Sequence, residues 1–139
     1  MILDPSNASI HVTDSIVFPE ETEDTTFILN KNFEVSANGA KIKALYFNES
    51  EVFRHYRLTQ ISPGSKVQLS YRGKLPTTIT RSRHIMPKVI FDPGFFYLDG
   101  SSAWYPRFKE FPYFSFSMNV EKPDGWEIIS QGKRTANNN

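Results

Sequence analysis

The residues best suited to acid–base or metal chemistry are three histidines, His11, His55 and His84, which lie far apart in the 139-residue sequence. A zinc peptidase needs an arrangement such as H-E-x-x-H, which places two imidazoles and a general base on one helical face. The sequence lacks that motif, a cysteine, a G-x-S-x-G turn and a phosphate-binding loop. We therefore interpret the histidines as structural or exposed, and expect no catalytic residue, bound cofactor or metal in this chain.

Two other polar patterns are weaker signals. The segment RSRH, residues 81–84, fits either contact with an acidic partner or a solvated hairpin loop, and its small size favours the loop. Asn7-Ala8-Ser9 and Asn48-Glu49-Ser50 match the acceptor pattern for N-glycosylation. Such triplets also arise by chance, so the compartment in which the protein works stays unknown.

The composition narrows the class of protein. The formal net charge is +1 with both signs interspersed, whereas a nucleic-acid binder usually shows a basic stripe. No apolar run approaches the roughly 20 residues of a membrane span, and the first residues do not resemble a signal peptide. We therefore expect no nucleic-acid partner and no membrane span. The 12 phenylalanines, 6 tyrosines and 2 tryptophans are ample material for one hydrophobic core.

The stretch GSSAWYPRF, residues 100–108, stands out because small residues precede adjacent Trp104 and Tyr105, and Pro106 follows them. Further aromatic residues continue to position 114. The rings could form a platform on which a sugar or peptide stacks, or they could close the end of a sheet. Burial of one large aromatic ring stabilises a fold by about 4 kcal/mol at roughly 25 cal/mol per Å². We therefore favour a structural plug formed by Trp104 and Tyr105.

The elements that must position these residues have a period of two. Ile10, Val12, Ile16 and Phe18 fall on one face of segment 9–18, and Asp14 interrupts that face. Segments 66–73 and 113–120 alternate in the same way, with three or four apolar residues on one face of each. Further strand candidates of ordinary length are 26–35, 41–47, 52–59, 88–93 and 126–130.

Glycine-containing turn signals separate these segments, including Asn38-Gly39, Pro63-Gly64 and Asp124-Gly125. No segment shows a sustained helical period. The pattern predicts an all-β domain, an antiparallel β-sandwich or saddle of about seven or more strands with no long helix. We expect this domain to span residues 1–133, with 134–139 as a polar tail or truncated linker.

The order of several segments resembles the N-terminal domain of the aminopeptidase N family of zinc metallopeptidases. The similarity runs from about residue 3 to about residue 133. Its most specific pieces are YRGKL, the loop YLDGSSAWYP and the closing stretch FSFSMNVEKPDGWEIISQGK. None of these pieces is a catalytic motif.

The resemblance implies a largely antiparallel β saddle that packs on a thermolysin-like catalytic domain and covers one side of the zinc cleft. That catalytic domain normally carries H-E-x-x-H and G-x-M-E-N, and neither motif occurs here. The implied partners are therefore a catalytic domain of the same polypeptide, which would hold the zinc, and through it a peptide substrate.

In much of the family, the loop that matches YLDGSSAWYP faces the cleft and carries a Gln-x-Glu pair that holds the substrate's N-terminal end. This chain has no Gln or Glu between Asp99 and Pro106. The candidates for contact at the cleft edge are Asp99, Gly100, Ser101 and Ser102, which we expect to be exposed. We expect Trp104 to be mostly buried.

Three functions remain open on the sequence alone. The first is an accessory domain of a zinc aminopeptidase that is inert by itself. The second is a free-standing module that binds carbohydrate or peptide through the aromatic loop 104–114, and the third is an interaction scaffold. Exposure of Trp104 and Tyr105 discriminates between them, because a platform needs its rings flat and facing solvent.

Overall fold

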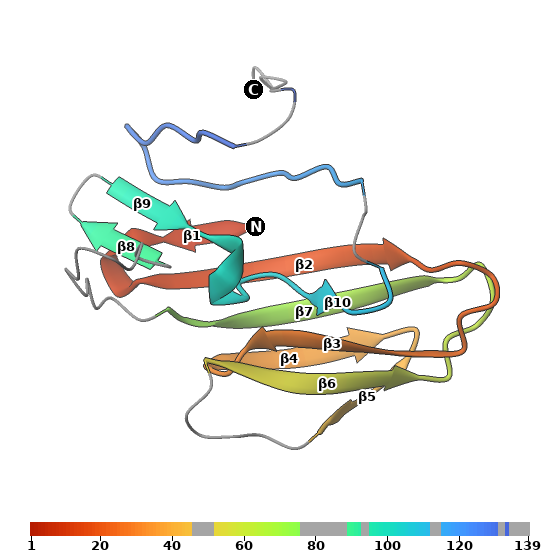
Figure 1. Ribbon diagram of the computed structural model, residues 1–139. Helices are drawn as coiled ribbons and strands as arrows, with labels where there is room; N and C mark the ends of the chain where they lie inside the picture. The colour runs from red at the N-terminus through yellow and green to blue at the C-terminus, as the bar shows by residue number, and fades with distance from the viewer. Residues whose placement is uncertain (46–51, 76–88, 93–94, 112–114, 131–132, 134–139) are drawn as a thin grey trace.

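The chain forms an all-β structure in which two antiparallel four-stranded sheets pack face to face (Figure 1). The computed structural model describes residues 1–45, 52–75, 89–92, 95–111, 115–130 and 133. Within these residues the only helical elements are two single 3₁₀ turns, and the sheets do not close into a barrel. The predicted fold class, an antiparallel β-sandwich or saddle without a long helix, is confirmed.

Sheet A has the strand order β1-β2-β7-β4 and sheet B the order β10-β3-β6-β5. The strands of sheet A are β1 (Ile2–Asp4), β2 (Ser9–Val17), β7 (Lys66–Lys74) and β4 (Phe33–Asn38). The strands of sheet B are β10 (Arg107–Phe108), β3 (Asp24–Asn30), β6 (Phe53–Thr59) and β5 (Lys41–Ala44). A separate hairpin consists of β8 (Val89–Asp92) and β9 (Phe95–Leu98), and the 3₁₀ turns are η1 (Pro5–Asn7) and η2 (Gly100–Ser102).

Alternation along the strands builds the core. In β7, Val67, Leu69 and Tyr71 point inward and are at most 1% exposed, while the intervening residues face solvent or are half-buried. The inward residues of β2, β3, β4 and β6 meet them, and this single cluster includes Ile10, Val12, Phe27, Leu29, Phe33, Tyr56 and Leu58. Burial of this apolar surface from both sheets is the main stabilising term of the fold.

Gly73 shows how closely two strands of sheet A approach each other. Its Cα faces Phe33 in the β4–β7 register. An added Cβ would overlap the carbonyl oxygen of Asn32 and would lie 2.7 Å from Cδ1 of Phe33. Only glycine fits this position, because the nearest obstacle is backbone and cannot rotate away.

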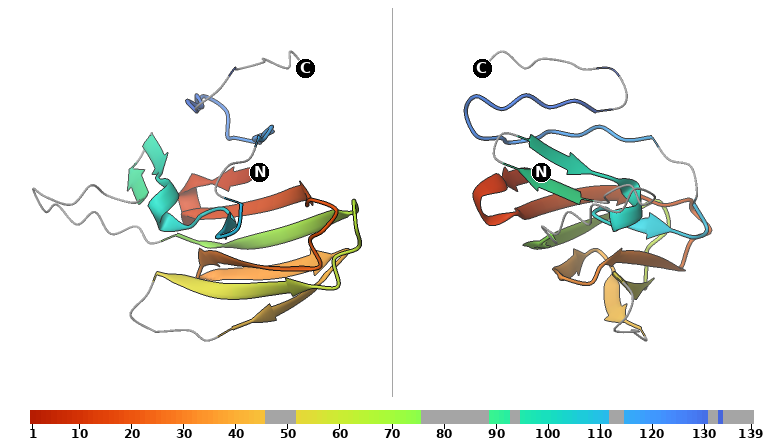
Figure 2. Two further views of the ribbon diagram at one scale, coloured as in Figure 1. Left: turned by 45° about the vertical axis from the view of Figure 1, so that its right-hand side comes forward. Right: turned by 60° about the vertical axis from the view of Figure 1, so that its left-hand side comes forward.

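A second region lies outside the two sheets, on the side of sheet A that carries β1 and the chain's N-terminus (Figures 1 and 2). We call this second region the outer region. It consists of the β8–β9 hairpin and the extended segment 115–130. Segment 115–130 reaches the sheet through Glu121, whose N–H donates to the Met1 carbonyl at 2.8 Å and whose carbonyl accepts from Leu3 N–H at 3.1 Å.

Most of the strand predictions are confirmed, and three are wrong. The inward faces of segments 9–18 and 66–73 are those that alternation predicts. Segment 26–35, expected as one strand, is broken after Asn30, so that β3 and β4 join different sheets. Residues 115–120 and 126–130 alternate like strands but belong to no strand of the structure. Phe116, expected to face inward, is 61% exposed. Alternation predicts which side chains share a face, but a strand also needs a neighbour with free backbone groups.

Candidate functional site

The predicted cleft-edge loop is a single 3₁₀ turn, η2, capped by Asp99. The Asp99 carboxylate accepts a hydrogen bond from Ser101 N–H at 2.8 Å, and its carbonyl accepts from Ser102 Oγ at 2.7 Å. The turn ends at Ala103, which adopts the left-handed conformation with φ 51°. Aspartate at such a cap satisfies a backbone N–H that the turn leaves unpaired. The local hydrogen bonds therefore occupy most of the polar groups that the sequence suggested for a ligand.

The turn is anchored to the end of β3 by Asn30, a residue that the sequence reasoning did not single out. The Asn30 side-chain amide donates to the Ser102 carbonyl at 2.9 Å, and its backbone N–H donates to the Ala103 carbonyl at 2.8 Å. Asn30, Ser102 and Ala103 are 2%, 3% and 0% exposed. Buried polar groups need partners, so Asn30 holds the turn firmly against the sandwich.

The expectation that Asp99 to Ser102 are all exposed is wrong for Ser102. Its hydroxyl is buried and donates to the backbone of the same turn, so it cannot reach a substrate. Asp99 and Gly100 are half-buried, and Ser101 alone is exposed. Of the proposed contacts, the hydroxyl of Ser101 is the one best placed for a ligand.

Trp104 and Tyr105 pack against each other edge to face, with ring centroids 5.0 Å apart and an interplanar angle of 76°. Both residues are half-buried, and Trp104 packs against the hydrophobic core. The Tyr105 hydroxyl lies close to Gly100. A Cβ added at position 100 would be 3.1 Å from the hydroxyl oxygen of Tyr105. We expected Trp104 to be mostly buried, and the structure shows it only half-buried. Its ring packs against the edge of the sandwich from one side.

The next two aromatic residues belong to the core region. Phe108 lies 5.4 Å from Phe18 and 5.3 Å from Phe27 between ring centroids, and Phe111 lies 5.8 Å from Phe18. Tyr113 and Phe114 lie outside the described residues. The described rings of loop 104–114 therefore pack edge-on or tilted and in contact with the sandwich, which favours the structural plug over a flat stacking platform.

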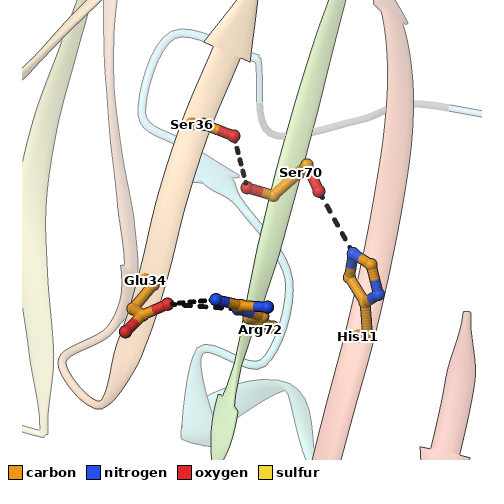
Figure 3. Close-up of polar contacts among 5 residues, drawn as sticks. All are labelled: His11, Glu34, Ser36, Ser70 and Arg72. Atoms are coloured by element: carbon orange, nitrogen blue, oxygen red, sulfur yellow. Dashed lines mark hydrogen bonds and ion pairs between the residues drawn. The ribbon is translucent and has the colours of Figure 1, made fainter.

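The sequence reasoning did not identify a polar cluster on the outer face of sheet A. Figure 3 shows its members on the adjacent strands β2, β7 and β4, and they are His11, Glu34, Ser36, Ser70 and Arg72. Arg72 donates from Nε to Glu34 Oε2 at 3.1 Å, and its Nη2 forms an ion pair with the same oxygen, also at 3.1 Å. His11 Nε2 lies 3.3 Å from Ser70 Oγ, and Ser36 Oγ donates to the Ser70 carbonyl at 3.5 Å. The register places Arg72 between His11 and Glu34, a relation that no local pattern shows.

The His11–Ser70 contact brings together a residue that can act as a base and one that can act as a nucleophile, but the described residues do not supply the other parts of a hydrolytic site. A working pair needs a third group that orients the imidazole and donors that stabilise an oxyanion. Ser70 sits in the middle of β7, where the hydrogen-bonding ladders to β2 and β4 occupy the backbone around it. A shallow hollow of about 360 Å³ lies beside the cluster, lined partly by Arg72, Gly73 and Lys74. The arrangement suits polar surface contacts.

The other sequence candidates are dispersed. His55 is exposed on the outer face of sheet B and lies edge to face with Phe53 at 5.6 Å. His84, the RSRH segment and Asn48 lie outside the described residues. Asn7 ends η1, and its side-chain amide donates to Asp4 Oδ2 at 2.6 Å.

One ionisable pair lies inside the sandwich. The Tyr71 hydroxyl donates to Asp14 Oδ2 at 2.8 Å, on the core-facing side of β2. Burial raises the pKa of Asp14, while the hydrogen bond from Tyr71 and the positive chain N-terminus oppose that shift. Burial also raises the pKa of Tyr71, and the neighbouring Asp14 charge adds to the effect. The predicted interruption of the apolar face at Asp14 is therefore accommodated by a tyrosine on the neighbouring strand.

The described residues were compared with what a metal site and a membrane span require in side chains and in helix length. No three His, Cys, Asp or Glu side chains there lie close enough together to hold a metal ion, so these residues do not fit a zinc site. Zinc in another domain stays a prediction. No helix in the described part of the chain is long and apolar enough to cross a membrane.

A comparison of the chain with protein-family models, curated protein sequences and solved structures found no match. The resemblance to the aminopeptidase N family therefore rests on the sequence segments alone.

Proposed function

We propose that this chain is a non-catalytic N-terminal domain of a zinc aminopeptidase, which docks on a catalytic domain and covers one side of its active-site cleft. The sequence resemblance suggests the family. The structural observation that supports docking is the exposure of large apolar side chains in the outer region. Phe95, Tyr97, Phe116 and Ile129 are 54%, 39%, 61% and 92% exposed.

These side chains come from two segments of the outer region, the hairpin strand β9 and segment 115–130. Phe95 and Tyr97 share one face of β9, whose other face, with Phe96 and Leu98, packs against the core. Segment 115–130 lies on the same side of the sandwich as the β8–β9 hairpin (Figures 1 and 2). Exposed apolar surface that gathers on one side of a domain is typical of an interface.

The pattern of segment 115–120 supports the same proposal. Phe116, Met118 and Val120 alternate with polar residues, as in a strand that buries one face. In this chain Phe116 stays exposed, and Met118 and Val120 are only half-buried. A partner domain on this side would cover the face that the alternation creates. In segment 41–47, Tyr46 and Phe47 lie outside the described residues.

Docking can be tested with the catalytic domain of an aminopeptidase N family member, purified separately and titrated with this chain in a calorimeter. We expect saturable binding that falls at least tenfold in a Phe95→Ser, Tyr97→Ser double variant. The matched control is Leu45→Ser with Val52→Ser, because these residues are each 37% exposed but flank β5 and β6 and lie outside the outer region.

Two results would contradict the proposal. One is equal binding by the test and control variants. The other is binding of a soluble glycan or peptide by the isolated chain that is lost in Trp104→Ala, which would favour the free-standing module. The family itself is tested by reading the natural transcript past the Asn139 codon, where we expect an H-E-x-x-H motif.

A further inference from the structure

The strand β5 forms an open edge of sheet B. It pairs with β6 on one side, and no other described segment pairs with its outer side (Figure 1). Leu45 N–H donates to the His55 carbonyl at 2.9 Å, and hydrogen-bonded pairs alternate along an antiparallel ladder. The backbone groups of Lys41 and Lys43 therefore face β6. Those of Ile42 and Ala44 point outward, away from the sheet.

The side chains on the solvent-facing side of β5 are basic. Lys41 and Lys43 are exposed, and the register places Lys43 directly opposite Arg57. Like charges in opposite positions on neighbouring strands repel each other. Arg57 is bound by Asp24, while neither lysine has an ion-pair partner among the described residues. An incoming carboxylate next to Lys43 would relieve this repulsion.

The other face of β5 is apolar. Ile42 lies opposite Leu58 of the core, is half-buried and packs against the core, and Ala44 lies opposite Tyr56. A strand added beside β5 would place alternate side chains on these two faces. Side chains beside the lysines would meet positive charge, and those between them would extend the apolar layer over Ile42.

Lysines on an edge strand also discourage pairing with further strands, because an apolar or basic strand would bury or oppose their charge. They select against such strands and in favour of an acidic one. The positive charges of Lys41 and Lys43 therefore favour a partner strand that carries carboxylates.

We propose that the outer edge of β5 binds, by strand addition, an extended polypeptide segment in which carboxylate and apolar side chains alternate. The backbone groups of Ile42 and Ala44 supply the hydrogen bonds, and Lys41 and Lys43 supply the charge selection. This site lies in β5, apart from the outer region proposed for docking, so either proposal can fail without the other.

The binding test uses the full chain and three blocked, fluorescently labelled peptides, read by anisotropy. TEVEVET has the proposed alternation, TKVKVKT reverses the charge, and TEPEPET keeps the charge but replaces the valines with prolines, which cannot donate backbone hydrogen bonds. We expect TEVEVET to bind at least tenfold more tightly than either of the others. We also expect TEVEVET to slow amide hydrogen exchange at Ile42 and Ala44 at least tenfold, measured by NMR.

Two variants separate backbone pairing from charge. Ala44→Pro removes an outward N–H without removing a bond to β6, a position at which an edge strand tolerates proline. Lys43→Glu reverses one charge beside the incoming strand. We expect each change to weaken TEVEVET binding at least tenfold. Lys66→Glu, the same charge change at an exposed position on sheet A, should leave it unaltered. Circular dichroism checks that each variant is folded.

Several outcomes would overturn the proposal. Equal binding of TEVEVET and TEPEPET, or equal binding of vesicles of anionic lipid, would indicate a site for negative charge alone. Unchanged exchange at Ile42 and Ala44 in the wild-type chain would exclude strand addition even if the proline variant failed to fold. Self-association of the chain in sedimentation experiments, lost in Lys43→Glu, would make a second copy the occupant.

Discussion

Both the sandwich and the outer region are rich in aromatic and aliphatic side chains, but they bury them to different extents. Phe27 and Leu58 in sheet B are 2% and 0% exposed, whereas Phe95 and Phe116 in the outer region are 54% and 61% exposed. The two sheets supply each other with an apolar layer, and the outer region has such a layer on one side only. Burial thus depends on a second surface at the right distance, and composition alone does not provide it.

The largest effect that tests this comparison is expected from Phe27→Ala. Phe27 stacks on Tyr56 with ring centroids 5.3 Å apart and also contacts Phe108. Loss of a fully buried aromatic ring should lower the free energy of unfolding by about 3–5 kcal/mol. Urea denaturation followed by circular dichroism measures this change. Phe95→Ala is the matched control, and a cost equal to that of Phe27→Ala would show that the two regions do not differ as described.

A smaller loss is expected from Trp104→Ala, at the border between the two regions. Because Trp104 is half-buried and packs on the core from one side, the cost should be about 2–3 kcal/mol, below the range for fully buried aromatic residues. The same denaturation experiment measures it, with Tyr97→Ala as the control on an exposed face. A variant with wild-type stability would contradict the structural plug.

A gain in stability is expected from Asp14→Asn at neutral pH. Burial raises the pKa of Asp14 in the fold, so the native state binds its proton more tightly than the unfolded chain does. The stability that this residue contributes is present below the unfolded pKa of 3.8 and is lost as the pH rises through the raised folded pKa. Asparagine avoids that loss and still accepts the hydrogen bond from Tyr71.

The melting temperature of Asp14→Asn should therefore exceed that of the wild type at pH 7, and the difference should shrink as the pH falls below 3.8. Scanning calorimetry at several pH values measures it. Asp124→Asn, at an exposed aspartate in the turn after Pro123, is the control. A variant that is less stable at pH 7 would mean that the bond from Tyr71 outweighs the burial of the charge.

The smallest effect is expected from Phe116→Ser combined with Ile129→Ser. Both side chains are largely exposed, so stability should change by no more than about 0.5 kcal/mol. Val67→Ser, at a fully buried position, should destabilise the domain severely by comparison. A marked loss of stability in the double variant would show that the outer region is part of the folded core, and would remove the support that its exposure lends to docking.

The sequence by itself determined which side chains share a face wherever a strand found a neighbour. The inward residues of β2 and β7 follow from alternation, and the turn at Asn38-Gly39 follows from glycine, whose φ of 87° suits no other residue well. The cap at Asp99 also has a local origin. Asp4 caps η1 in the same way, and each turn ends at an alanine in the left-handed conformation.

Only the tertiary structure decided which of these local elements are buried. Ser102 is covered because Asn30, 72 residues away, holds its turn against β3. Segment 115–130 lies outside both sheets although it alternates like a strand, and the open edge falls on β5 because of the order of strands in sheet B. Hydrogen-bond pairing and burial are properties of two segments together, so the residues of one segment cannot specify them.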